Sequence, residues 1–190
     1  MVRGAFTTVA LLVVCGAVGA IPTAAAVTSN SNFSFVEWVD QIIADPEGDH
    51  LTPEQAVAAF YAGRDSGSPS GTFGIAEYGK RAFLGKRWAS CDEAPGTQAQ
   101  VPDAVACINR LASFGGQACR VNSYSRFCTI GTAIINGDSG TAQTSSSCND
   151  VARGAGFIMD QCTRPDNTVE GSEFAYGNGQ LLVRIHRTGT

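Results

Sequence analysis

The motif with the clearest nucleophilic character is Gly137-Asp138-Ser139-Gly140, a serine in a glycine-rich stretch. A serine nucleophile needs a histidine base held against it. The only histidine before Ser139 is His50, in a segment that we expect to be removed, and a serine-protease loop would carry a further glycine where Thr141 stands. We therefore interpret NGDSG as a polar turn and predict no catalytic residue there.

The remaining acid, base and charged groups also indicate no catalytic centre. His186 is the sole histidine after Arg87, and among the acidic residues of that region only Asp92 and Glu93 are adjacent, so a paired-carboxylate glycosidase site is not indicated. Seven arginines and nine acidic residues give residues 88–190 a net charge of 7 minus 9, or −2. The basic stripe of a nucleic-acid-binding protein is missing, as is a phosphate-binding glycine loop. We expect no enzymatic activity, no cofactor and no nucleic-acid partner.

Six of the seven cysteines lie after Arg87, and the seventh, Cys15, lies in an apolar run at the N-terminus. Export exposes thiols to oxidation, so an even number of cysteines predicts three disulfides. A zinc site would need CxxC pairs or neighbouring histidines, and no two cysteines are that close. We predict no metal. The predicted disulfide cysteines are Cys91, Cys107, Cys119, Cys128, Cys148 and Cys162.

The N-terminus has the pattern of a secretory signal peptide. Arg3 is followed by an apolar run and then by small residues up to Ala26, which is the order of a signal and its cleavage site. A membrane anchor is the alternative, but a span needs about 20 apolar residues, and threonines and glycines interrupt this run. We predict a signal peptide over residues 1–26, cut after Ala26 or alternatively after Ala20, and a secreted, extracellular product.

The tripeptide Gly-Lys-Arg occurs twice shortly before the first of these six cysteines and contains the only two lysines of the chain. Kexin-type proteases of the secretory pathway cut after Lys-Arg pairs, and the flanking glycines favour an accessible loop. A solvated basic face is the alternative. We predict a propeptide over residues 27–87 and a mature domain over 88–190, with its start at Ala82 if only the first pair is cut. The predicted cleavage residues are Lys80, Arg81, Lys86 and Arg87.

The predicted propeptide has helical patterns of its own. Apolar residues recur at helical spacing from Phe35 to Ile43, and Thr52-Pro53-Glu54-Gln55 forms a capping box before an apolar run that stops at Gly63. This segment could fold or dock while attached. Asn32 begins a glycosylation sequon, and residues 63–74 read as a flexible linker.

The mature region predicts an α+β sandwich, with two helices on one face of an antiparallel sheet. One helix opens at Pro102 and ends at Gly115-Gly116, and the other is capped by Ser147 and runs to Cys162. We expect strands over 118–122 and 126–135, with 141–144 as an extension after the turn at NGDSG. A hairpin over 173–187 turns at Gly177-Asn178-Gly179.

Six cysteines allow 15 pairings, and helix geometry removes one bond. Cys148 and Cys162 are 14 residues apart on one helix, hence about 21 Å apart, whereas a disulfide holds its Cα atoms within about 7 Å. They should not be bonded to each other. Cys119 to Cys128, and Cys107 to the strand after its helix, stay open as possibilities.

The chain resembles the secreted fungal killer toxins and the related small effectors of plant-associated fungi. The resemblance rests on VPDAVACINRLASFGGQAC, SSCNDVARGAGFIMDQC and AYGNGQLLVRI, about half of the mature region. It implies a ferredoxin-like sandwich, a membrane-active, antagonistic or host-manipulating role, and no enzymatic activity. It transfers no disulfide pairing and no active residue.

We therefore expect a secreted non-enzymatic toxin or effector that acts on competing cells or a host. Its partner would be a membrane protein, a cell-wall polymer or a host protein. The alternative is a small secreted hydrolase or hydrolase inhibitor. An inhibitor would present NGDSG or RPDNTVEGS as a rigid exposed loop, and a hydrolase would need clustered carboxylates or His186 in a cleft.

Overall fold

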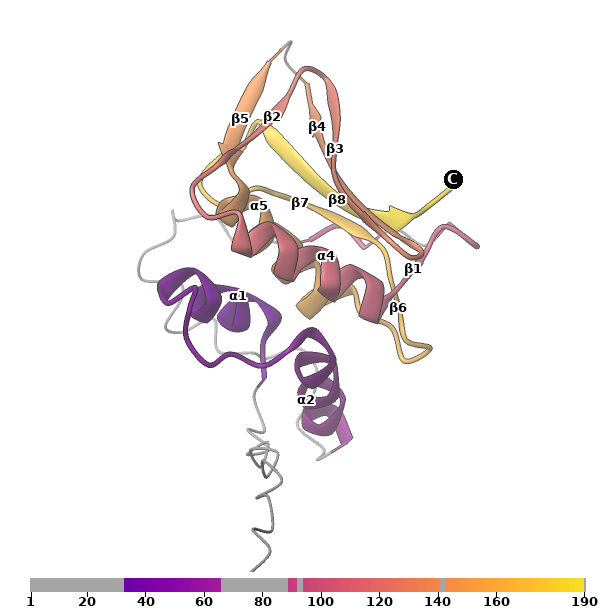
Figure 1. The fold of residues 1–190 in the computed structure, drawn as a ribbon. Helices are drawn as coiled ribbons and strands as arrows, with labels where there is room; N and C mark the ends of the chain where they lie inside the picture. The colour runs from indigo at the N-terminus through magenta and orange to yellow at the C-terminus, as the bar shows by residue number, and fades with distance from the viewer. Residues whose placement is uncertain (1–32, 66–88, 92–93, 141–142, 190) are drawn as a thin grey trace, which may run out of the picture.

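The protein folds into three layers, in which helices α4 and α5 lie between a β-sheet and a second pair of helices, α1 and α2 (Figure 1). The structure is a computed structural model that describes residues 33–65, 89–91, 94–140 and 143–189. Helices on one face of an antiparallel sheet, joined by disulfides, confirm the predicted α+β class.

The main sheet has four antiparallel strands in the order β3-β4-β8-β7. The strands are β3 (Tyr124–Ile130), β4 (Ala133–Ser139), β7 (Gly171–Phe174) and β8 (Leu181–Arg187). Along the chain the elements run α4-β3-β4-α5-β7-β8. Moving β8 to the front would give β-α-β-β-α-β, so the arrangement is that of a ferredoxin-like sandwich whose first strand has moved to the end of the chain.

The two central helices begin and end where the sequence predicts. Helix α4 (Val101–Ser113) has a proline in its first turn, and it is followed by Gly115 at a φ of +62°, a conformation that favours glycine. Helix α5 (Cys148–Cys162) begins after Ser147, whose side chain accepts a hydrogen bond from the Asp150 amide. Both helices bury residues on two sides, against the sheet and against the N-terminal helices.

Two short ribbons flank the main sheet. β1 (Ala99–Gln100) pairs with β6 (Thr168–Val169), and β2 (Ala118–Val121) pairs with β5 (Thr144–Ser147). In Figure 1 the β2–β5 ribbon stands at one end of the main sheet. The predicted extension over 141–144 is wrong: residues 141–142 lie outside the described residues, and Thr144 begins β5, which pairs with β2 and not with the main sheet.

The N-terminal helices are α1 (Phe35–Ala44) and α2 (Pro53–Asp65). The predicted capping box is present, because the Gln55 amide donates to Thr52 Oγ1 at 3.3 Å and the Thr52 amide donates to Gln55 Oε1 at 2.9 Å. The predicted stop at Gly63 is wrong, because α2 continues to Asp65. Residues 63–65 of the predicted linker are thus helical.

One apolar core joins all three layers. Ile135, Val183 and Ile185 from the sheet belong to the same buried cluster as Ile108 of α4 and Phe35 of α1. The N-terminal helices are therefore part of the hydrophobic core of the protein.

All six cysteines form disulfides, in the pairs Cys91–Cys162, Cys107–Cys128 and Cys119–Cys148. Cys148 and Cys162 are the first and last residues of α5, and they are not bonded to each other, as predicted. The possible Cys119–Cys128 bond is wrong, because β2 pairs with β5 and not with β3. The possible bond from Cys107 to the strand directly after its helix is also wrong, because Cys107 is bonded to Cys128 of β3, the second strand after α4.

The predicted strand over 126–135 is wrong, because a hairpin turn divides it at Gly131-Thr132. Gly131 has a φ of +51°. Asp103 of α4 accepts hydrogen bonds at this turn from the Thr132 amide at 2.6 Å and the Thr132 hydroxyl at 2.8 Å. The polar turn predicted at NGDSG is also wrong: Asn136 to Ser139 lie in β4, at the centre of the sheet.

Several sequence predictions lie outside the described residues. They are the signal peptide over 1–26, the sequon at Asn32, and the cleavage residues Lys80, Arg81, Lys86 and Arg87.

Candidate functional site

Two sites on opposite faces of the molecule could carry function. The first is the face of α4 and α5 that turns away from the sheet, on which α1 packs against both helices and α2 packs against α4. Phe35 and Trp38 of α1 are almost fully buried there, at 0% and 1% exposure. We call this contact the α1–α2 interface.

The most specific contact of the interface is made by Asp160 of α5. Its carboxylate accepts hydrogen bonds from the Ser34 hydroxyl at 2.7 Å and from the amides of Phe35 at 2.7 Å and Val36 at 3.2 Å. The first amides of a helix have no partner inside the helix, and the helix dipole favours a negative charge beside them. Asp160 therefore caps the start of α1 from a residue more than 120 positions away in the chain.

Burial raises the pKa of Asp160 to about 6. The hydrogen bonds from Ser34, Phe35 and Val36 lower it, and the nearby charge of Glu37 raises it further. Loss of hydration is the largest of these effects, because the carboxylate is covered when α1 lies over it.

Further polar contacts surround this cap. Arg153 of α5 donates from Nε to Asp40 of α1 at 2.6 Å, and also contacts Asp150 at 2.9 Å. Tyr61 of α2 donates its hydroxyl hydrogen to the Asn167 side chain at 2.9 Å. Apolar contact at the centre and charged pairs at the edge are the usual anatomy of a specific protein interface.

Gly156 of α5 lets the α1 backbone come close. A Cβ atom at this position would lie 3.2 Å from both the Phe35 carbonyl oxygen and the Val36 nitrogen. These neighbours are backbone atoms, which cannot rotate away as a side chain could. The interface thus includes a direct contact between the two helix backbones.

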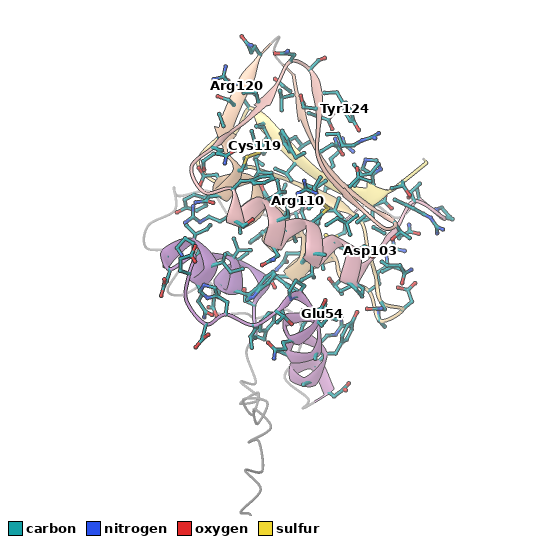
Figure 2. All side chains as sticks on the ribbon, viewed as in Figure 1. Glu54, Asp103, Arg110, Cys119, Arg120 and Tyr124 are labelled. Atoms are coloured by element: carbon teal, nitrogen blue, oxygen red, sulfur yellow. A yellow bond between two sulfur atoms is a disulfide. The ribbon has the colours of Figure 1, made fainter. Side chains whose placement is uncertain are left out.

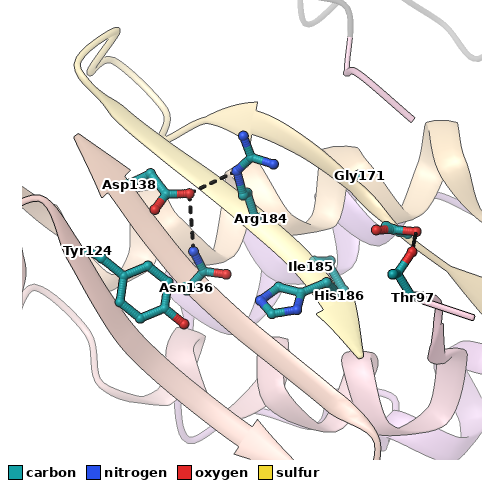
Figure 3. Close-up of a pocket in the computed structure, with 9 residues that line it drawn as sticks. Thr97, Tyr124, Asn136, Asp138, Gly171, Arg184, Ile185 and His186 are labelled. Atoms are coloured by element: carbon teal, nitrogen blue, oxygen red, sulfur yellow. Dashed lines mark hydrogen bonds and ion pairs between the residues drawn. The ribbon is translucent and has the colours of Figure 1, made fainter. Parts of the chain in front are cut away.

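The second site is a cavity of about 390 Å³ on the face of the main sheet that α4 and α5 do not cover. Figure 3 shows side chains of β3, β4 and β8 around it. Tyr124, Asp138 and Leu182 occupy one register row across these strands, and Asn136 and Arg184 occupy the next. The lining residues are Thr97, Tyr124, Asn136, Asp138, Glu170, Gly171, Arg184, Ile185 and His186. We call this site the sheet pocket.

The charged groups of the sheet pocket are held by near neighbours. Arg184 Nε lies 2.8 Å from an oxygen of Asp138, as Figure 3 shows. Glu170 accepts hydrogen bonds from the Thr97 hydroxyl at 2.6 Å and from Gln98 at 3.0 Å. The pocket is therefore polar, and its carboxylates are engaged by donors.

The structure brings together residues that the sequence did not connect. His186 lies on the face of β8 that points away from α4 and α5, and it lines the sheet pocket together with Asp138 and Glu170. Their common position depends on the strand order, for which the sequence contains no local signal. The helical patterns of residues 35–43 and 52–63 indicated that this segment could dock, but they did not predict which residues of α4 and α5 it contacts.

Of the two loops predicted for an inhibitor, NGDSG is not a loop and RPDNTVEGS is only partly exposed. NGDSG lies largely in β4, and RPDNTVEGS includes β6 and the start of β7, where Val169 and Glu170 are buried at 0% and 7% exposure. Pro165 and Asp166, at the start of RPDNTVEGS, form an exposed turn between α5 and β6, so this segment keeps an exposed turn of the kind that an inhibitor would present.

Among the described residues, no cluster of three or more His, Cys, Asp or Glu side chains is arranged to hold a metal ion. Within the same ranges, none of the helices combines the length and apolar character that crossing a membrane requires.

Residues 86–187 match a protein family described as a domain of unknown function, DUF8794. The chain belongs to this family. The matched region begins two residues before Trp88 and contains the whole main sheet, α4, α5 and all three disulfides. Helices α1 and α2 lie outside it. No curated protein and no solved structure matches the chain.

Proposed function

We propose that the protein is a secreted non-enzymatic toxin or effector whose residues 27–87 are a propeptide. In this proposal α1 and α2 are the folded part of the propeptide and cover the face of α4 and α5. Cleavage at the Lys-Arg pairs separates them from the mature domain, which then acts on competing cells or a host through the uncovered face.

The cap that Asp160 places on α1 carries the proposal. A carboxylate that accepts three hydrogen bonds at the start of a helix makes a specific contact. This contact joins the predicted propeptide to the predicted mature domain. Such a contact suits a segment that must find its place on the domain and cover it.

Three further observations support the proposal. All three disulfides lie within residues 91–162, so none of them ties α1 or α2 to the domain. The family match begins at residue 86, the lysine of the second Lys-Arg pair. Disulfides of this number in a small domain are typical of oxidising compartments such as the secretory pathway.

The first test is processing. The full chain is expressed in a secreting fungal host, and the secreted species is sequenced from its N-terminus. We expect a start at Trp88, or at Ala82 if only the first pair is cut. The double variant Arg81→Ala/Arg87→Ala should keep residues 27–190 as one chain, and a wild-type start near Val27 would refute the propeptide.

The second test is activity. The purified domain of residues 88–190 is applied to competing fungal cells and to plant leaf tissue, with and without an excess of the 27–87 segment. We expect growth arrest or necrosis from the domain alone, suppression by the added segment, and loss of the effect when the disulfides are reduced. A domain that acts equally well with the segment bound would contradict the covering role.

A small secreted hydrolase is the second candidate, because His186, Asp138 and Glu170 line one pocket. Against it, Asp138 is paired with Arg184 and Glu170 accepts two hydrogen bonds, and a general acid must instead carry a proton to its substrate. A panel of glycan and protein hydrolase assays decides between the two. Turnover that His186→Ala abolishes would replace the toxin proposal with this one.

A further inference from the structure

The sheet pocket lies on the opposite side of the molecule from the α1–α2 interface, and no helix of the described chain covers it. In Figure 2, Tyr124 on the sheet and Glu54 on α2 mark these two sides. A ligand in the sheet pocket therefore would not compete with α1 and α2, and the pocket needs an explanation separate from the proposed propeptide.

Asn136 is the most informative residue of this pocket. It lies on the central strand β4 at 1% exposure, and its amide nitrogen donates to Asp138 at 3.3 Å. No donor among the described residues reaches its Oδ1 atom. A buried acceptor without a partner costs about 1 to 3 kcal/mol, so a polar side chain is kept at a position where an apolar one would be more stable.

The charges beside Tyr124 and Asn136 favour a neutral ligand, and the further carboxylate of the lining, Glu170, is hydrogen-bonded to Thr97 and Gln98. Asp138 and Arg184 neutralise each other at 2.8 Å, so a phosphate or a cation would have to compete with an existing ion pair. A hydroxyl group does not have this difficulty, because it can donate to Asn136 Oδ1 or Asp138 and accept from Arg184 without breaking the pair.

Tyr124 supplies an aromatic surface beside these polar groups. Its side chain is 50% exposed, although large apolar side chains are usually buried. It faces Asp138 across the β3–β4 pair, and its ring lies open at the edge of the pocket (Figure 3). An aromatic ring presents an apolar face with a polar tip, which suits a ligand that has both C–H faces and hydroxyl edges.

We propose that the sheet pocket binds a neutral carbohydrate. One sugar ring packs on Tyr124, and its hydroxyl groups bond to Asn136, Asp138 and Arg184. The proposal does not depend on the propeptide, because it concerns the other face of the protein.

The test measures binding of soluble neutral glycans to the protein as secreted, with its disulfides intact. The probes are hexamers of β-1,3-glucose, of N-acetylglucosamine and of α-1,6-mannose, and inorganic phosphate is the charged comparison. Calorimetry and ligand-observed NMR measure the binding of each probe. We expect at least one hexamer to bind. Tyr124→Ala should weaken its binding about tenfold or more, which corresponds to about 1.4 kcal/mol.

Phe174→Ala is the matched control. Phe174 is the other large apolar residue that is exposed in the described chain, at 41%, and it stands at the far edge of the same register row without lining the pocket. Its loss should leave the affinity unchanged. Asn136→Leu should abolish binding without lowering the melting temperature, which separates a ligand role from a structural one.

Three outcomes would overturn the proposal: no hexamer binds, binding is indifferent to Tyr124→Ala, or phosphate binds in place of the hexamers. Shortening of a bound glycan during the titration would support the carbohydrate site while contradicting the non-enzymatic function proposed above. Glycan binding by a protein that is never cleaved at the Lys-Arg pairs would support the carbohydrate site and contradict the propeptide proposal.

Discussion

At the scale of single residues, Asp160 and Gly156 do most to define where α1 lies. Asp160 fixes the start of α1 by accepting its first amides, and Gly156 sets how closely the two helices approach. Both belong to α5, inside the family match, while the groups that they contact lie outside it. The domain thus carries the features that receive the N-terminal helices.

The pKa of Asp160 predicts how association of a separate 27–87 segment depends on pH. In the docked form the pKa is raised to about 6 from an ordinary value of 3.8, and we expect removal of α1 to expose Asp160 to water and return its pKa toward that ordinary value. The docked form therefore holds the proton more tightly. Association should be strongest below about pH 4 and weaken about tenfold to a hundredfold as the pH rises through 6.

Calorimetric titration of the 27–87 segment into the 88–190 domain between pH 3.5 and 7.5 measures this dependence. Asp160→Asn keeps the size of the side chain but cannot titrate, so it should flatten the profile between pH 4 and 6. A wild-type affinity that rises with pH would show that the hydrogen bonds to the carboxylate outweigh its burial.

Gly156→Ala should have opposite effects on the free domain and on docking. In a helix interior alanine is favoured over glycine by about 1 kcal/mol, so the free 88–190 domain should become more stable. The new Cβ would press on the α1 backbone at 3.2 Å, so affinity for the 27–87 segment should fall. Urea unfolding of the domain measures the change in stability, and titration of the segment measures the change in affinity. An affinity that rises together with the stability would contradict the backbone contact.

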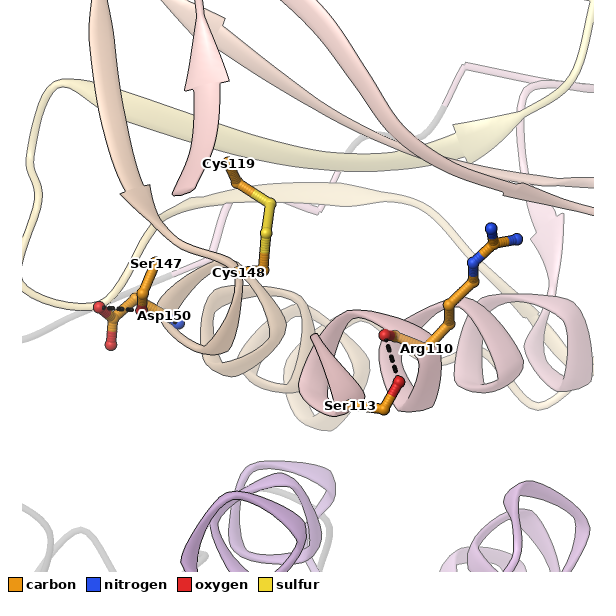
Figure 4. The surroundings of a disulfide bond; sticks show 6 residues. All are labelled: Arg110, Ser113, Cys119, Ser147, Cys148 and Asp150. Atoms are coloured by element: carbon orange, nitrogen blue, oxygen red, sulfur yellow. Dashed lines mark hydrogen bonds between the residues drawn. A yellow bond between two sulfur atoms is a disulfide. The ribbon is translucent and has the colours of Figure 1, made fainter. Parts of the chain in front are cut away.

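At the scale of elements, turns and disulfides fix how strands meet helices. The β3–β4 turn is held by Asp103 of α4 and by Gly131 in a left-handed conformation. The β2–β5 ribbon is tied to the start of α5 by Cys119–Cys148, which Figure 4 shows between a strand and the first turn of the helix. Each connection joins the sheet layer to the central helices.

Gly131→Ala should destabilise the protein by about 1 to 3 kcal/mol, because residues with a side chain are strained at positive φ. The added Cβ would also collide with the Asp103 carboxylate. Gly179→Ala, in the β7–β8 turn with open space around it, is the control and should change stability little. Denaturant unfolding measures both, and a neutral Gly131→Ala would show that this turn can relax.

Replacing both Cys119 and Cys148 by alanine should lower stability by about 2 to 4 kcal/mol, since the bond closes a loop of about 30 residues in the unfolded chain. Chemical unfolding of the variant and of the oxidised protein measures the loss. The Cys107–Cys128 bond should remain intact in a peptide map of the variant. Reshuffling of that bond would mean that the β2–β5 ribbon helps to direct the pairing.

The sequence predicted the helices better than the strands, for physical reasons. Caps and apolar spacing are local, so Ser147, Thr52 and the glycines after α4 marked helix ends correctly. The run from Arg126 to Ile135 is rich in strand-forming residues and conceals a turn at Gly131. NGDSG has turn composition, but pairing with both β3 and β8 outweighs that preference.

The candidate sites were less predictable than the elements that form them. The sheet pocket collects residues from β3, β4, β8 and the segment before β7, and their meeting depends on the position of β8 between β4 and β7. The Asp160 cap joins residues more than 120 positions apart. No local pattern encodes such contacts.

At the scale of the whole molecule, α4 and α5 are buried on two sides, by the sheet and by α1 and α2 (Figure 1). The N-terminal helices have 10 and 13 residues, and isolated helices of this length are marginal in water. Their structure therefore depends on the domain beneath them.

A synthetic peptide of residues 33–65 should accordingly be largely unfolded alone and become helical when the 88–190 domain is added. Circular dichroism of the peptide, the domain and their mixture measures this change. A domain variant with Asp160→Ala should induce less helix at the same concentrations, because an N-cap contributes about 1 kcal/mol. A peptide that unfolds cooperatively on its own would show that residues 33–65 fold independently of the 88–190 domain.

Because no disulfide joins α1 and α2 to the cysteine-rich region, their association depends on the continuity of the backbone. While the backbone is continuous, a tether keeps the two parts at an effective concentration that can reach about the millimolar range. A cut between them would turn this internal contact into a bimolecular equilibrium. If the protein is secreted and cut as proposed, a high concentration in the vesicles would favour the complex, and dilution outside the cell would favour release of the domain.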